Sequence, residues 1–441
     1  MAKEKLALIS LGCAKNLVNS EQMLCLLDDA GYPLVSDPAQ ADGVIINTCG
    51  FIDDAKSEAI DTILEMARLR EAGTLRKIIV TGCLPERYRA EIRSELPEVD
   101  AMVGVGSFAD IVSVVEETFS QGASARFGDK NAPVDEVGRY LTTGPGWAYL
   151  KIAEGCSNCC SFCAIPAIRG RYRSRPMENI LAEARALAEA GVKEMLVIAQ
   201  DITRYGVDLY GEKRLPALLN ALCDLDFQWI RLHYLYPDAI TDELLDTIAA
   251  QPKICHYLDI PIQHCNDAVL KAMRRRETKA GLLDLFARIR RRIPDIVLRT
   301  SIITGLPFED EAAFDELCAF LRQVRIQRVG AFPFSPEEGT PAADMPNRVD
   351  GDEAARRAEL VMDVQSDVMD DFNESRLGTV VTVLCDGWDE EAQSFVGRSY
   401  AESPGIDGVI YFDAPVAHPG DMLPVRITGV MDGDLTGEVE G

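Results

Sequence analysis

Short apolar runs alternate with amphipathic stretches along most of this 441-residue chain. In its first third, strand-sized runs lie at Leu6–Leu11, Gly43–Asn47 and Lys77–Thr81, and a helical pattern follows each of them. Strands that alternate with helices pair in parallel, because each helix carries the chain back to the same end of the sheet. Residues 1–140 are therefore predicted to form a parallel α/β domain. Gln121–Gly146, with its Gly, Pro and Ser residues and no clear period, is predicted to be a linker.

The same alternation continues over residues 141–375, which carry six further strand-like runs. A series of this length predicts a partial or complete parallel barrel with helices around it. The six runs are Ala148–Ile152, Glu194–Ile198, Trp229–His233, Tyr257–Ile260, Ile296–Ile302 and Arg328–Phe332. Over residues 376–441 the pattern changes to short strands divided by Gly, Pro and Asp, which predicts a small antiparallel barrel. The predicted fold class is thus α/β with a C-terminal β-barrel.

Apolar run length, the N-terminal pattern and net charge argue against a membrane protein, a secreted protein and a chain that binds nucleic acid over its whole surface. The longest apolar runs are strand-sized, well short of the ~20 residues needed to cross a bilayer, so no membrane association is predicted. No cleavage pattern follows Lys3 and Lys5, so we expect no signal peptide and a cytoplasmic protein. The 71 acidic residues against 45 basic ones give a net charge of −26, which argues against a surface that grips a phosphate backbone throughout.

The chain has 13 cysteines, which in a reducing compartment favour metal binding or redox chemistry over disulfides. Cys13, Cys49 and Cys83 each follow the end of a predicted strand of the first domain. Ligands bind such sheets outside the carboxyl ends of the strands, so these three thiolates are predicted to converge there. Five cysteines that sit singly in apolar patterns are expected in the core: Cys25, Cys223, Cys255, Cys318 and Cys385.

The densest group of cysteines can be divided in two ways. Cys156 with Cys159, and Cys160 with Cys163, would be two C-x2-C pairs of a zinc site, but zinc modules usually separate their pairs by about 15–20 residues. Divided as C-x3-C-x2-C, Cys156, Cys160 and Cys163 supply three thiolates to a four-iron cluster and leave one iron open for a ligand. We favour the second division, with Cys159 as a bystander rather than a ligand.

This second division, with Phe162 before the last cysteine, resembles the radical S-adenosylmethionine enzymes. With the N-terminal cysteines and the terminal barrel added, the chain resembles the methylthiotransferases along essentially its whole length. The resemblance implies two 4Fe-4S clusters and a C-terminal TRAM domain. The radical cluster would be held by Cys156, Cys160 and Cys163, and the auxiliary cluster by Cys13, Cys49 and Cys83.

The resemblance also implies the reaction. S-adenosylmethionine serves twice, as the methyl donor and as the source of a 5′-deoxyadenosyl radical that removes hydrogen from an unactivated carbon. The sulfur of the transferred methylthio group would come from inorganic sulfide or sulfane sulfur. The electron for radical formation would come from a donor such as flavodoxin or ferredoxin.

Three further stretches match the family in order: Leu258–His264, Thr304–Glu309 and Phe334–Thr340. The resemblance places five residues in the S-adenosylmethionine pocket or at the barrel mouth: Phe162, Gln200, Asp201, His264 and Gly305. Phe308 stands where the family usually has a second glycine. Read from the residues alone, His233, His256 and His264 are better interpreted as hydrogen-bonded structural histidines.

The family divides between enzymes that modify a transfer RNA adenosine and enzymes that modify an aspartate of small-subunit ribosomal protein twelve. The segment Arg376–Gly441 has three arginines against twelve acidic residues. Such a segment would repel phosphates and attract a basic ribosomal protein. The predicted function is therefore addition of a methylthio group to the β-carbon of an aspartate in ribosomal protein twelve, as free protein or in the assembling ribosome.

Three alternatives remain. Modification of transfer RNA is supported by arginines within residues 169–175, 274–276 and 288–292, although solvated faces and ion pairs explain these as well. A non-catalytic iron–sulfur electron carrier or sensor would need neither a barrel nor an open iron at each cluster. A zinc-binding module would contain zinc and no iron.

Overall fold

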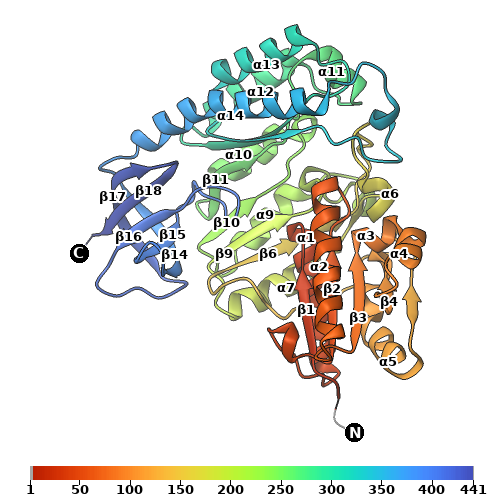
Figure 1. Cartoon of the computed structure of the whole chain (residues 1–441). Helices are drawn as coiled ribbons and strands as arrows, with labels where there is room; N and C mark the ends of the chain where they lie inside the picture. The colour runs from red at the N-terminus through yellow and green to blue at the C-terminus, as the bar shows by residue number, and fades with distance from the viewer. Residues whose placement is uncertain (1–2, 441) are drawn as a thin grey trace. The chain divides into compact units, whose positions relative to one another are not determined.

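The computed structural model describes residues 3–440, which fall into two compact units (Figure 1). Among the described residues, the first unit contains residues 3–142 together with residues 153–179 and 335–343. The second contains residues 143–152, 180–334 and 344 onward. The first unit therefore gathers three stretches that lie far apart in the sequence.

The first unit is built on a sheet of five parallel strands that follow one another in chain order. The strands are β1 (Leu6–Ser10), β2 (Gly43–Thr48), β3 (Lys77–Gly82), β4 (Ala101–Val103) and β5 (Ser124–Arg126). The helices are α1 (Ala14–Asp29), α2 (Asp53–Glu71), α3 (Cys83–Arg87), α4 (Arg89–Glu95) and α5 (Ile111–Gln121). This confirms the predicted parallel α/β domain. The prediction of a linker was wrong at β5, which pairs with β4 as the edge strand.

Helices cover both faces of this sheet, because successive strand residues point to opposite sides. Ile46 packs in a buried cluster with Ile63 of α2, whereas its neighbour Ile45 packs with Leu27 of α1 and Val114 of α5. Every residue of β2 is consequently buried. The continuous apolar run in the sequence is the signature of a strand covered on both faces.

The second unit contains six parallel strands, again in chain order, with β6 and β13 at the two edges. The strands are β6 (Trp147–Lys151), β9 (Glu194–Ile198), β10 (Trp229–Leu232), β11 (Ile254–Asp259), β12 (Val297–Thr304) and β13 (Arg328–Pro333). The main helices are α7 (Met177–Glu189), α9 (Leu215–Cys223), α10 (Asp242–Ala250), α11 (Asp267–Ala272), α12 (Lys279–Arg292), α13 (Glu311–Val324) and α14 (Gly351–Glu374). The sheet is therefore a partial barrel. Among residues 3–440 we find no helix with the length and apolar character of a membrane span.

A closed five-stranded barrel ends the chain and confirms the predicted small β-barrel. Its strands are β14 (Val380–Asp389), β15 (Ser394–Arg398), β16 (Ile410–Asp413), β17 (Met422–Met431) and β18 (Asp434–Val439). Strand β18 was not predicted from the sequence, because half of its residues are polar and one is glycine. It forms because β17 on one side and β16 on the other satisfy its backbone hydrogen-bonding groups.

The loop between β15 and β16 joins this barrel to the parallel strands of the second unit. Ser403 Oγ lies 2.9 Å from His233 Nε2, and the Asp407 carboxylate accepts a 2.6 Å hydrogen bond from the Tyr257 hydroxyl. Glu402 accepts from Arg328 at 3.0 Å and also pairs with Arg376. These side chains are buried, so a network of charges and hydroxyls holds the terminal barrel to the strands.

Candidate active site with two sets of cysteines

The three N-terminal cysteines follow the carboxyl ends of three neighbouring strands. Cys13 follows β1 and precedes α1, Cys49 follows β2, and Cys83 follows β3 as the first residue of α3. The loops lie close together, because a Cβ added to Gly12 would come within 2.7 Å of the Cys49 Cβ. Gly12 has a φ of +85°, a conformation that a residue with a side chain adopts only at a cost. The structure thus brings together the strand-end cysteines that the sequence predicted to converge.

Buried amide side chains hold these loops in place through hydrogen bonds to backbone carbonyls. Asn16 donates 3.0 Å hydrogen bonds to the carbonyls of Leu11 and Thr48, which tie the ends of β1 and β2 together. Asn47 in turn donates to the Asn16 carbonyl at 2.8 Å. These residues were not identified from the sequence, although an asparagine within the apolar run of β2 was a usable signal, since a buried amide needs partners.

The second set of cysteines lies on a loop closed by a short two-stranded ladder. β7 (Ala153–Glu154) pairs in antiparallel fashion with β8 (Arg173–Ser174) at the base of the loop. Within the loop, the Cys156 amide donates to the Gly170 carbonyl at 3.2 Å, and the Cys163 amide donates to the Cys160 carbonyl at 3.1 Å. Helix α6 (Ile165–Arg169) follows the last cysteine. Phe162, between two of these cysteines, is half-buried.

Cys159 differs from its neighbours in backbone conformation. Its φ is +56°, in the left-handed region that is uncommon for residues other than glycine, and its side chain is exposed, whereas Cys156, Cys160 and Cys163 are half-buried. The sequence-based assignment of Cys159 as a bystander stays a prediction.

Arg169 connects the two sets of cysteines within the first unit. Its buried guanidinium donates to Glu154 at 2.9 Å and to the side chain of Asn16, which lies behind the N-terminal cysteines. Cys83 also packs directly against Ala164, the residue after Cys163, and against Ile168. From the sequence, Arg169 was one of the arginines that could contact RNA, so its role as a buried bridge was not foreseen.

The surroundings of the N-terminal thiols determine how readily they ionise. Burial raises the pKa of the Cys83 thiol to about 12, although the positive charge of Arg169 acts in the opposite direction. Burial likewise raises the pKa of Cys49. At Cys13, desolvation is outweighed by the charges of Lys15 and Arg169 and by backbone N–H groups, so its pKa is lowered. Of the three, only Cys83 is buried, Cys49 is half-buried and Cys13 is exposed; all three would become thiolates when a metal replaces the proton.

The donor sets fit iron–sulfur clusters better than single ions. Among residues 3–440 no three His, Cys, Asp or Glu side chains lie close enough to hold one metal ion. Three thiolates that bind three different irons of one cluster do not need that closeness, and the three loops are near neighbours, because a Cβ on Gly12 would meet Cys49 at 2.7 Å and a Cβ on Gly50 would meet the Cys83 backbone at 3.1 Å. Thiolates are also the usual ligands of 4Fe-4S clusters.

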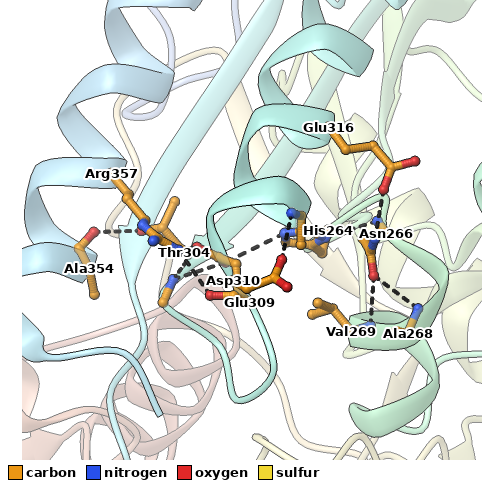
Figure 2. Close-up of polar contacts among 12 residues, drawn as sticks. His264, Asn266, Ala268, Val269, Thr304, Glu309, Asp310, Glu316, Ala354 and Arg357 are labelled. Carbon is orange, nitrogen blue, oxygen red and sulfur yellow. Dashed lines mark hydrogen bonds and ion pairs between the residues drawn. The ribbon is translucent and has the colours of Figure 1, made fainter. Parts of the chain in front are cut away.

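In the second unit, His264 belongs to a buried polar network at the loop after β12 (Figure 2). Its Nδ1 accepts a 2.9 Å hydrogen bond from the Asn266 amide, so the ring proton sits on Nε2, which lies 3.4 Å from the Glu309 carboxylate. Glu309 also accepts from the Gly305 amide at 2.9 Å and from Arg357 of α14 at 2.9 Å. The Nδ1 side of the ring thus fits the hydrogen-bonded structural histidine that the residues alone favoured, but the buried Nε2 makes no hydrogen bond within residues 3–440, so the role of His264 stays a prediction.

The other predicted mouth residues also lie in the second unit. Asp201 is buried after β9, where it caps the short 3-10 helix Ile202–Arg204 through the Thr203 amide and pairs with Arg204 at 3.1 Å. Gln200, the residue before it, is half-buried. Gly305 has a φ of +76°, and a Cβ there would lie 2.3 Å from the Ala354 Cβ. Cofactor contacts for these residues stay predictions.

Phe308 adopts a φ of +72°, so the position that usually holds glycine in the family still has a glycine-like backbone. A left-handed conformation costs a residue with a Cβ on the order of 1 kcal/mol, and Phe308 is 40% exposed. We therefore expect Phe308→Gly to raise the free energy of unfolding by about 1 kcal/mol in denaturant titrations. Phe308→Ala keeps the Cβ and should give no gain. Equal stabilisation by both variants would show that the ring, not the backbone, is responsible.

Three family models match consecutive parts of the chain. They are the Uncharacterized protein family UPF0004 over residues 5–104, the Radical SAM superfamily over residues 150–321 and the TRAM domain over residues 377–439. Among solved structures, the radical S-adenosylmethionine methyltransferase TsrM from Kitasatospora setae matches with a TM-score of 0.57 at 14% identity, over 77% of this chain and 74% of that one. At this identity the likeness concerns the fold.

The partial barrel, the C-x3-C-x2-C loop and the matching model define a radical S-adenosylmethionine protein. Two relatives cover the full length. A ribosomal protein uS12 methylthiotransferase RimO from Geobacter sulfurreducens is 48% identical over 99% of both chains. One from Clostridioides difficile is 44% identical over 99% of this chain and 98% of the other. The chain belongs to the RimO family of ribosomal protein uS12 methylthiotransferases.

Proposed function

We propose that this chain transfers a methylthio group to the β-carbon of an aspartate in ribosomal protein uS12. The observation that carries the proposal is the gathering of two three-cysteine sets in one compact unit, with Arg169 and the packing of Cys83 against Ala164 between them. A carbon radical and a methylthio group must meet within one site, so both sets have to be held close together. An electron carrier or sensor would not require this arrangement.

Two 4Fe-4S clusters and S-adenosylmethionine are the cofactors of this reaction. When bound, they supply the reducing electron, the radical and the methylated sulfur. The chain's own residues hold and orient these groups. Cys156, Cys160 and Cys163 would bind the radical cluster, and Cys13, Cys49 and Cys83 the auxiliary one. The ladder of β7 with β8 and the bonds of Asn16 fix the two loops, so little reorganisation is needed before reaction.

The charge of the terminal barrel supports a protein substrate. Its three arginines are all engaged by carboxylates: Arg376 by Glu402, Arg398 by Asp386 and Glu194, and Arg426 by Glu440. They therefore leave no unpaired arginine to hold a phosphate, whereas the acidic side chains of Glu390 and Glu391 remain exposed. Such a domain attracts a basic polypeptide and repels a nucleic acid backbone.

Most of the arginines that could support RNA binding have carboxylate partners. Arg169 and Arg175 are buried against Glu154 and Glu136. Of the later groups, Arg276 pairs with Asp238 and Arg292 with Asp242 and Asp246. The positive charge of these four arginines is thus neutralised in part, whereas the exposed Arg171, Arg274 and Arg291 have no carboxylate partner among residues 3–440. This favours the interpretation of solvated faces and ion pairs over that of an RNA-binding surface.

Two finer parts of the proposal concern partners. The reducing electron would come from a small carrier such as flavodoxin or ferredoxin. The substrate would be uS12, either free or within the assembling small subunit. Both stay predictions, and the first is tested when each carrier replaces a chemical reductant in the assay below.

Competition between two substrates tests the proposal. The reconstituted chain is incubated with S-adenosylmethionine, a reductant, uS12 and an isopentenylated anticodon stem-loop. We expect mass spectrometry to find a methylthio mass gain on an aspartate of uS12 and none on the RNA. A gain on the RNA adenosine alone would contradict the proposed substrate while keeping the radical chemistry.

A further inference from the structure

The segment between β13 and α14 leaves the second unit and folds into the first. Residues 335–343 belong to the first unit, although both flanking elements belong to the second. We call Ser335–Ala343 the strap. If the strap only connected β13 to α14, its hydrogen-bond partners would lie in the partial barrel. Glu337 and Glu338 of the strap instead contact the N-terminal domain, and Ala342 contacts the loop of the second set of cysteines.

Glu337 anchors the first half of the strap. Its carboxylate is 2% exposed and accepts hydrogen bonds from Arg87 at 2.6 Å, Lys56 at 3.2 Å and Ser335 at 2.6 Å. Arg87 also donates to the Glu338 carbonyl at 2.6 Å. A carboxylate removed from water to this extent and held by two cations forms a strong, directional contact. Loss of its charge would leave Arg87, only 10% exposed, without a counter-ion.

The ion pairs of Glu337 with Arg87 and Lys56, which we call the anchor, join the strap to the segments that carry two of the auxiliary cysteines. Arg87 is the last residue of α3, which begins at Cys83, and the same guanidinium donates to the Gly50 carbonyl, directly after Cys49, at 3.0 Å. Arg87 is therefore a joint between the Cys49 loop, the Cys83 helix and the strap. Lys56, on α2, adds a second cation from the element that follows Cys49.

The other end of the strap reaches the radical cysteines. The Ala342 amide donates a 2.9 Å hydrogen bond to the carbonyl of Ser161, which stands between Cys160 and Cys163. One short segment thus contacts the Arg87 side chain, which itself bonds to the Cys49 loop, at one end, and the backbone between two radical cysteines at the other. Arg169 provides a separate connection between the two sets, so the fold does not depend on the strap alone.

We propose that the strap sets the position of the auxiliary cysteines relative to the radical cysteines, with Glu337 and Arg87 as positioning residues for methylthio transfer. This inference rests on the proposed function. Radical formation needs only the cysteines of the second set. Methylthio transfer needs both sets of cysteines at the correct distance and orientation from each other. Displacement of one reacting group by about 1 Å costs up to about 100-fold in rate. A weakened anchor should therefore uncouple the two steps.

The test compares Glu337→Gln with Glu338→Gln, a matched change at the neighbouring exposed carboxylate. For Glu337→Gln we expect native iron content and native 5′-deoxyadenosine formation, with about tenfold less methylthiolated uS12 per 5′-deoxyadenosine. We also expect a changed magnetic interaction between the two reduced clusters in electron paramagnetic resonance spectra. Glu338→Gln should match the native chain in all four measurements. Arg87→Met should reproduce the uncoupling.

Three outcomes would overturn the inference. An unchanged ratio of product to 5′-deoxyadenosine in Glu337→Gln would show that the anchor does not position the clusters. Loss of iron together with both activities would show a merely structural role, as would an unchanged magnetic interaction. Absence of uS12 methylthiolation by the native chain would instead refute the proposed function, so the two failures are distinguishable.

Discussion

Cys160→Ala should abolish formation of 5′-deoxyadenosine, while Cys49→Ala should preserve it and lose methylthio transfer. Cys160 lies in the loop closed by β7 and β8, and its removal takes one of three thiolates from the radical cluster. Cys49 lies at the end of β2 beside Cys13 and Cys83, so its removal affects the auxiliary cluster. In both variants the rate of methylthio transfer to uS12 should fall at least about 1,000-fold, because the three thiolates of a cluster act together and the loss of one disables the whole set.

Iron content and product analysis check this pair of variants. After anaerobic reconstitution each should lose roughly one cluster's iron, with 5′-deoxyadenosine and methylthiolated uS12 quantified separately by mass spectrometry. Cys159→Ala is the matched control within the same loop, and its iron content and activity should stay close to native. Retention of the complete reaction by Cys160→Ala or Cys49→Ala would refute the role assigned to that residue.

Glu402→Gln should give the largest loss of stability among single changes in the terminal barrel. The Glu402 carboxylate is buried between Arg328 and Arg376 and also accepts from the Ser399 hydroxyl at 2.6 Å. Removing its charge leaves two buried guanidinium groups without a counter-ion, which costs about 3–5 kcal/mol. Glu440→Gln removes the exposed partner of Arg426 and should cost less than about 1 kcal/mol. Urea unfolding followed by circular dichroism compares the two.

The same contacts predict how this difference depends on pH. Burial alone would raise the pKa of Glu402, but attraction by Arg376 and Arg328 outweighs it and holds the pKa at about 2. A carboxyl whose pKa is lower in the folded chain than in the unfolded chain stabilises the fold above its unfolded pKa, near 4.3. The gap between native chain and Glu402→Gln should therefore be constant above about pH 5 and narrow as the pH falls toward 2. A gap that widened on acidification would contradict the assignment.

The elements of the fold were largely predictable because their signals are local. Apolar runs and helical periods identified β1, β2, β3 and the six strands of the partial barrel. Five short or polar strands were not predicted: β4, β5, β7, β8 and β18. β5 has three residues and none is fully buried, and β18 gains its backbone partners only when the barrel closes. No periodicity marks such segments, since their stability comes from neighbours distant in the sequence.

The sequence by itself determined the chemistry of this protein: three cysteines after strand ends, three more in a C-x3-C-x2-C loop, and an acidic terminal barrel. Tertiary structure decided how these parts are held. Glu337 meets Arg87 across 250 positions of the chain, and Arg169 meets Asn16 across 153. Strand order and loop packing bring such charges together, and burial then makes each pairing obligatory, because an unpaired buried charge costs several kcal/mol. The spacing of these residues along the chain therefore does not predict which of them pair.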